Sequence, residues 1–117
     1  MNDNRLPVLP PENPSTLISG PNWRYLVPFQ IKNTSTIEKL IQCESEGANI
    51  AHKDSNGLIS WGILQFNGTS TWAEMATRFN LHGSPLIPAD AIRMADAMIS
   101  DGFLGRWTCA HLMHLIK

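Results

Sequence analysis

Apolar side chains recur with helical spacing in four segments of the chain. Three of these segments are residues 71–79, 90–100 and 107–116, where the apolar positions have the spacing expected of helices that bury one face. The first and clearest stripe, at i, i+3, i+4 and i+7, consists of Ile37, Leu40, Ile41 and Glu44. We therefore predict four helices, and the first is unusual because a carboxylate completes its apolar stripe.

Short polar motifs predict where these helices begin and end. Ser35–Glu38 and Thr71–Glu74 both fit the capping box, in which a hydroxyl and a carboxylate satisfy free backbone donors at a helix start. Gly47 and Gly102 offer stops after the first and third helices.

Helical spacing is lost between His52 and Asn67, which predicts a different local structure there. Asn56-Gly57 is typical of a type I′ hairpin turn, because both positions tolerate positive φ. We predict a small β-hairpin around it, with residues 58–61 as the second strand. The predicted fold class is mainly α (α+β), a helical domain with a small hairpin inserted after its first helix.

Residues 1–32 form a predicted Pro-rich arm, and residues 33–117 the folded domain. Six of the eight prolines lie between Pro7 and Pro28, which disfavours regular helix. Residues 23–29 include Trp23, Tyr25 and Phe29, so this part is expected to pack on its own domain or to dock on a partner.

Composition excludes some function classes. The chain has 117 residues, a formal net charge of −1 and no run of like charges, which disfavours a general nucleic-acid binder. No apolar stretch reaches the ~20 residues needed to span a bilayer. No signal peptide is visible at the start, so export would need a leader already removed or another route. We expect a monomer.

Glu44 is the candidate catalytic group. Burial on an apolar stripe and the negative end of a helix both disfavour its ionised form. A carboxylic acid that keeps its proton near neutral pH is what cleavage of a glycosidic bond requires. The alternative is that Glu44 extends outward, or pairs with Lys39 or Lys53.

The motifs around Glu44 resemble the lysozyme-like superfamily. Cys43-Glu44-Ser45-Glu46-Gly47 is followed by a polar hairpin and then by Ser60-Trp61-Gly62-Ile63-Leu64-Gln65-Phe66-Asn67. The order of these motifs is similar to the order found in small lytic transglycosylases, resuscitation-promoting factors and goose-type lysozymes. Thr71-Trp72 also resembles a pair in resuscitation-promoting factors, and the likeness covers roughly residues 35–72.

The resemblance implies a role for each matched residue. Glu44 would be the catalytic acid, and Gly62 would let the backbone approach a sugar. Trp61 is expected to face the glycan cleft and Trp72 the core. The remaining expected substrate-binding residues are Ser45, Gln65 and Asn67.

One departure from the family affects the predicted mechanism. Hen-type lysozymes carry an Asp two residues before the matching Gly, where this chain has Ser60. This argues against a retaining mechanism with two carboxylates. Lytic transglycosylases work with one Glu. Ser60 is therefore interpreted as a possible auxiliary residue beside the catalytic Glu44. Asp54 could position water in an inverting hydrolase, or could be a turn residue that bonds its own backbone.

The resemblance therefore implies a peptidoglycan lytic transglycosylase that cuts the β-1,4 bond between N-acetylmuramic acid and N-acetylglucosamine. The alternatives are a muramidase that uses water and a non-catalytic module that binds cell-wall glycan. A helical adaptor unrelated to the cell wall is the last choice. The resemblance implies no metal and no organic cofactor.

Cys43 and Cys109 could be buried thiols or one disulfide. The cell-wall interpretation implies an extracytoplasmic, oxidising compartment, where a disulfide is expected. It would tie the catalytic helix to the last helix. His111 and His114 lie at i and i+3 without an evident third ligand, so they are interpreted as surface residues.

Overall fold

The computed structural model describes residues 31–116. This part is a mainly α, α+β fold in which a three-stranded antiparallel sheet follows the first of four α-helices. In chain order the elements are α1 (Thr34–Glu44), β1 (Ala51–Lys53), β2 (Ile59–Trp61), β3 (Phe66–Asn67), α2 (Gly68–Phe79), α3 (Pro88–Ser100), a 3₁₀ helix η3 (Leu104–Arg106) and α4 (Thr108–Leu112). The expectations for the arm lie outside the described residues, apart from its last two positions.

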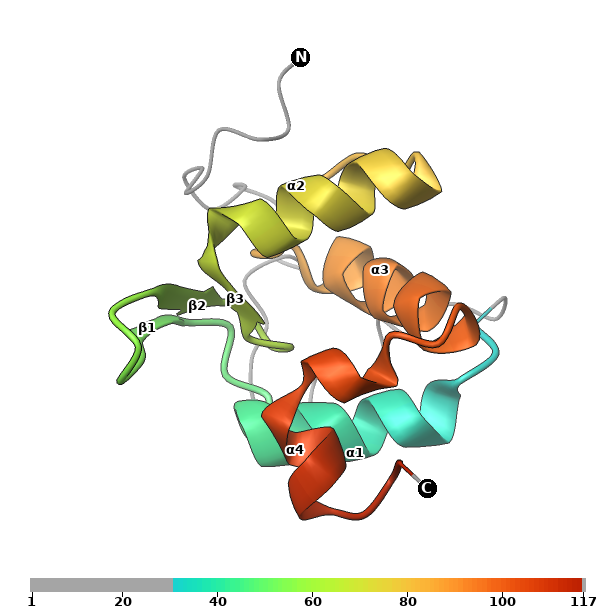
Figure 1. The fold of residues 1–117 in the computed structure, drawn as a ribbon, viewed down its shortest axis with the longest axis horizontal. Helices are drawn as coiled ribbons and strands as arrows, with labels where there is room; N and C mark the ends of the chain where they lie inside the picture. Colours follow the sequence, from blue (N-terminus) through green and yellow to red (C-terminus); the bar gives the residue numbers. More distant parts are fainter. Residues whose placement is uncertain (1–30, 117) are drawn as a thin grey trace.

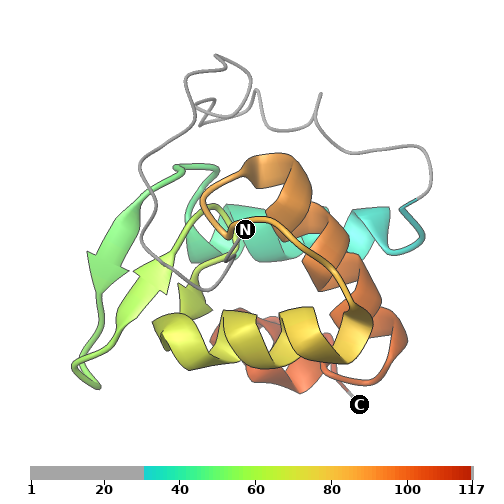
Figure 2. The same cartoon turned by 90° about the horizontal axis from the view of Figure 1, so that it is seen from above.

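The helices surround one apolar core, and the sheet stands at one side of it. Helix α3 packs against both α1 and α2, while α4 packs against η3 and α1 (Figure 1). The view from above shows the β1–β2 hairpin extending away from the helices (Figure 2). The buried core comprises Ile37, Leu40, Ile41, Ile63, Leu64, Phe66, Trp72, Met75, Ala91, Ile92, Met94, Ala95, Met98, Trp107, Cys109 and Ala110.

Helix α1 confirms the predicted apolar stripe but not its predicted start. Its N-cap is Asn33, and no side chain caps it. The carboxylate of Asp96 on α3 instead holds the entering chain, because Asp96 Oδ1 accepts the backbone N–H of Asn33 at 2.9 Å and of Lys32 at 3.1 Å. The capping box at Ser35 is therefore wrong, since a tertiary contact fixes where this helix begins.

Helix α2 also starts earlier than its predicted capping box. It begins at Gly68, directly after β3, and Gly68 has a φ of +72°. The chain turns from strand to helix at this glycine, so Thr71 lies inside the helix. Helix α3 begins at Pro88, a favoured first position, and ends at Ser100 as predicted.

Helix α4 is shorter than predicted. We expected helix over residues 107–116, but α4 ends at Leu112, and His114 has a φ of +54°. Positive φ interrupts a right-handed helix. The predicted apolar stripe is also wrong in part, because Leu112 is 69% and Ile116 37% exposed.

The hairpin lies where it was predicted, with a different turn and a third strand. Gly57 has a φ of +84° whereas Asn56 has no positive φ, so the type I′ turn is wrong. Asn56 Oδ1 accepts the Leu58 backbone N–H at 2.9 Å, an interaction typical of Asn in turns. Strand β3 pairs with β2 and was not predicted.

The predicted disulfide is confirmed between Cys43 and Cys109, with a Cα–Cα distance of 6.0 Å. It joins the C-terminal turn of α1 to the first turn of α4. No helix among residues 31–116 is both long and apolar enough to span a membrane.

Candidate active site

A cleft of about 600 Å³ lies between the end of α1, the sheet, the start of α2 and the segment that leads into α4. Glu44 lines it from α1, and Asp54 lines it from the hairpin. The other lining residues are His52, Ser55, Asn56, Ser60, Gln65, Phe66, Asn67, Thr71, Met98, Arg106, Trp107, Thr108 and Cys109. Most of these side chains are polar, and two of them, Glu44 and Asp54, carry carboxyl groups.

Glu44 is the last residue of α1, one position after Cys43. Its Oε2 accepts the backbone N–H of Cys109 at 3.2 Å. Burial is the main cause that raises the pKa of Glu44 above its usual 4.5, and the nearby charge of Asp54 adds to it, while the Cys109 hydrogen bond partly opposes both. No ion pair joins Glu44 to Lys39 or Lys53 in the part of the chain that the structure describes.

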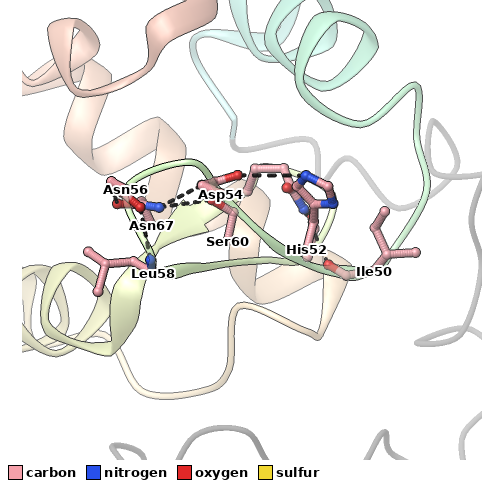
Figure 3. Close-up of polar contacts among 9 residues, drawn as sticks. Ile50, His52, Asp54, Asn56, Leu58, Ser60 and Asn67 are labelled. Carbon is pink, nitrogen blue, oxygen red and sulfur yellow. Dashed lines mark hydrogen bonds and ion pairs between the residues drawn. The ribbon is translucent and has the colours of Figure 1, made fainter.

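Asp54 is held by a network of side chains on the sheet (Figure 3). The Ser60 hydroxyl and the Asn67 amide both donate to Asp54 Oδ2, the latter at 2.6 Å. Asn67 Oδ1 in turn accepts the Asn56 amide at 2.9 Å. The second carboxylate oxygen, Oδ1, lies 4.0 Å from His52 Nε2.

The register of the sheet explains how these residues meet. His52 lies opposite Ser60, and Ser60 lies opposite Asn67, so the three side chains form one cross-strand row. All three line the cleft. Asp54 follows His52 by two residues, which is the spacing that returns a side chain to the same face.

This geometry bears on the two interpretations of Asp54. Its side chain bonds Ser60 and Asn67 rather than the backbone of its own turn, and Asn56 fills that role instead. Ser60, expected as an auxiliary residue, orients the carboxylate. A second acid therefore lies in the cleft, although Ser60 occupies the position two residues before Gly62 where hen-type lysozymes carry an Asp.

Gln65 lines the cleft and is anchored by the backbone. Its amide nitrogen donates to the carbonyl oxygens of Gly62 at 2.8 Å and Ile50 at 3.2 Å. These two bonds satisfy the polar nitrogen of an amide that lies within an apolar segment. The amide oxygen makes no hydrogen bond within residues 31–116, so it is the atom that could accept one from a ligand.

Three residues expected at the glycan, Ser45, Trp61 and Gly62, lie outside the cleft lining. The Ser45 hydroxyl donates to Ile63 O at 2.7 Å and accepts the Gly47 N–H at 3.0 Å, outside the cleft lining. A Cβ on Gly62 would lie 1.9 Å from Pro85 O, so this glycine accommodates the close approach of the loop at Pro85. Trp61 is 5% exposed.

Strand alternation explains why Trp61, expected at the cleft, does not line it. Ser60 faces the cleft, and successive residues of a strand point to opposite faces. Trp61 therefore lies away from the cleft and is not part of its lining. Trp72 is 1% exposed and lies in the core, as expected.

Sequence reasoning missed several residues of the cleft. His52 could have been found from the hairpin register, since it pairs with Ser60. Arg106 and Thr108 come from the segment after α3, for which the sequence offers no comparable signal. Arg106 also bonds Glu74 at 3.1 Å.

No group of three potential metal ligands occurs among the described His, Cys, Asp and Glu residues. His111, considered as a ligand from the sequence, is exposed and its Nε2 lies 2.9 Å from Gly105 O.

No protein-family model matches this sequence, and neither a curated protein nor a solved structure matches it.

Proposed function

We propose that this protein is a lysozyme-like glycosidase that hydrolyses the β-1,4 bond between N-acetylmuramic acid and N-acetylglucosamine in peptidoglycan. The observation that carries the proposal is the pair of carboxyl groups on one cleft in contrasting surroundings. Burial raises the pKa of Glu44, whereas Asp54 accepts two hydrogen bonds on one oxygen. Contrasting surroundings of this kind allow one carboxyl group to act as the general acid and the other as the general base.

Glu44 serves as the general acid. Its proton passes to the bridging oxygen while the bond from that oxygen to the anomeric carbon breaks. A raised pKa suits this step, because the group must still be protonated at the pH of the reaction. The neighbouring Gln65 amide, fixed through its nitrogen, presents an oxygen to a sugar hydroxyl or N-acetyl N–H.

Asp54 serves as the base for water. Both partners of Oδ2 are donors, which suits an ionised carboxylate. Oδ1 can then accept a proton from a water whose oxygen bonds to the anomeric carbon on the face opposite the leaving group. The products are a free 4-hydroxyl and a new reducing end of inverted configuration.

This mechanism favours the water-using alternative over the lytic transglycosylase that the sequence first suggested. A transglycosylase needs one carboxyl group, and the substrate's own 6-hydroxyl replaces water. The presence of Asp54 beside the cleft, held by Ser60 and Asn67, supports hydrolysis. The disulfide is compatible with an extracytoplasmic site of action.

Digestion of purified sacculi tests the proposal. Wild-type protein should reduce their turbidity, and mass spectrometry should find muropeptides with reducing ends. Glu44→Gln should abolish lysis, while Glu46→Gln, an exposed neighbour outside the cleft, should not. Asp54→Asn should lose most activity, whereas Asp101→Asn, whose partner is Arg78, should retain it.

Two outcomes would overturn the mechanism. Anhydro ends together with an active Asp54→Asn variant would favour the transglycosylase. Binding to sacculi without lysis by the wild type would leave a non-catalytic glycan-binding module.

A further inference from the structure

Cys109 is linked to the C-terminal end of α1 in two ways, by a hydrogen bond to Glu44 and by a disulfide to Cys43. Its backbone N–H donates to Glu44 Oε2 at 3.2 Å, and its sulfur is bonded to Cys43, the residue before Glu44. Cys109 is 6% exposed and lines the cleft. The covalent link and the hydrogen bond therefore connect the same two turns of chain.

Helix α4 cannot hold that N–H in place alone. It has five residues, and isolated helices of this length are unstable in water. Its first turn is fixed by tertiary contacts, namely the disulfide and the preceding Trp107, whose Nε1 donates to Leu64 O at 2.9 Å. Of these two, the disulfide is the covalent link to α1, against which α4 also packs.

We propose that the Cys43–Cys109 disulfide is a positioning element for the acid, because it holds the Cys109 N–H against Glu44 Oε2. A protonated carboxyl group has one carbonyl oxygen that accepts and one hydroxyl oxygen that donates. The donor at Oε2 makes that atom the carbonyl oxygen. The transferable proton is thereby assigned to Oε1. This inference extends the proposed function and depends on it.

The titratable and charged groups around Glu44 determine how its protonation, and therefore the activity, should depend on pH. The hairpin presents His52 and Asp54, and η3 presents Arg106. Helices α2 and α3 contribute Thr71 and Met98 to the cleft, and α4 contributes no titrating side chain to its lining. The hydrogen bond from the Cys109 N–H lowers the pKa of Glu44 and so opposes burial and the nearby Asp54, which both raise it.

Removing the disulfide should therefore change activity in a specific way. Without the N–H at Oε2, the pKa of Glu44 rises further, and the alkaline limb of the kcat profile moves to higher pH. A less well oriented acid should also lower kcat about tenfold, less than the ~100-fold cost of a 1 Å misplacement. KM should change little.

Two NMR titrations test the geometry without reference to activity. In the wild type, the Cys109 amide proton shift should follow the same midpoint as the Glu44 carboxyl carbon. In Glu44→Gln this titration of the amide should vanish. A flat amide shift in the wild type would overturn the proposal. Because no substrate is involved, this result is separate from whether the protein cleaves glycan.

The variant C43A/C109A then tests the disulfide while retaining the backbone N–H. It should show the higher Glu44 midpoint and the lower kcat on sacculi. Asp96→Ala is the control, because it removes a stabilising contact at a residue that does not line the cleft and should leave both unchanged. A folded C43A/C109A with the wild-type midpoint and kcat would show that the disulfide only stabilises. If it does not fold, a flat Cys109 amide shift in the wild type still overturns the proposal.

Discussion

Replacing Gly62 by Ala should destabilise the fold much more than replacing Gly57, although their backbones are alike. Their φ values are +81° and +84°, so an L side chain costs about 1–2 kcal/mol at either position. A Cβ at Gly57 would have no atom within 4 Å. A Cβ at Gly62 would lie 1.9 Å from Pro85 O and 3.0 Å from Pro85 C.

The difference between the two variants isolates this contact. The obstructing atoms belong to the backbone, so the loop around Pro85 must move, and overpacking of this kind costs about 1–3 kcal/mol. We therefore expect a loss of about 1–2 kcal/mol for Gly57→Ala and about 2–5 kcal/mol for Gly62→Ala.

Urea unfolding followed by tryptophan fluorescence measures both losses. Equal losses would refute the close approach of Gly62 to the loop. A Gly62→Ala protein of nearly wild-type stability that no longer bound glycan would restore the role first expected of this residue, as a site of sugar approach.

Three further results are expected. Asp96→Ala should lose about 1–3 kcal/mol of unfolding free energy, because the donors of Asn33 and Lys32 lose their acceptor; an unchanged urea midpoint would contradict this. C43A/C109A should lose roughly 4 kcal/mol in the chain-entropy model for a closed loop of this length, and equal melting temperatures with and without the disulfide would refute it. Because folding raises the pKa of Glu44 above 4.5, the folded state binds more protons than the unfolded state. The free energy of unfolding should therefore fall as the pH rises from 4.5 through the raised pKa. A Glu44→Gln protein should lack this decline, and urea midpoints of the wild type and of Glu44→Gln that run parallel from acid to neutral pH would contradict it.

Features that depend on local spacing could be predicted from the sequence. The stripe of α1 places Ile37, Leu40 and Ile41 in the core, and it also brought Glu44 into partly buried surroundings. The Asn56-Gly57 pair located the hairpin, since turn residues act within a few positions.

Features that depend on contacts between residues far apart in the sequence could not be predicted in this way. Helix α1 starts where Asp96, 63 residues from Asn33, holds the chain. Ser45 bonds Ile63 O, 18 residues away, so its hydroxyl is not available to a sugar. The face of Trp61 follows from the strand register, because a shift of one residue exchanges the two faces.

The anomeric configuration of the first product tests the central claim most directly. Proton NMR of sacculi or glycan strands during the first minutes of digestion distinguishes a new α reducing end from a β one. Inverting hydrolysis by Glu44 and Asp54 predicts that the α-anomer forms first and mutarotates afterwards. A β-anomer formed first, or a 1,6-anhydro product without a reducing end, would contradict it.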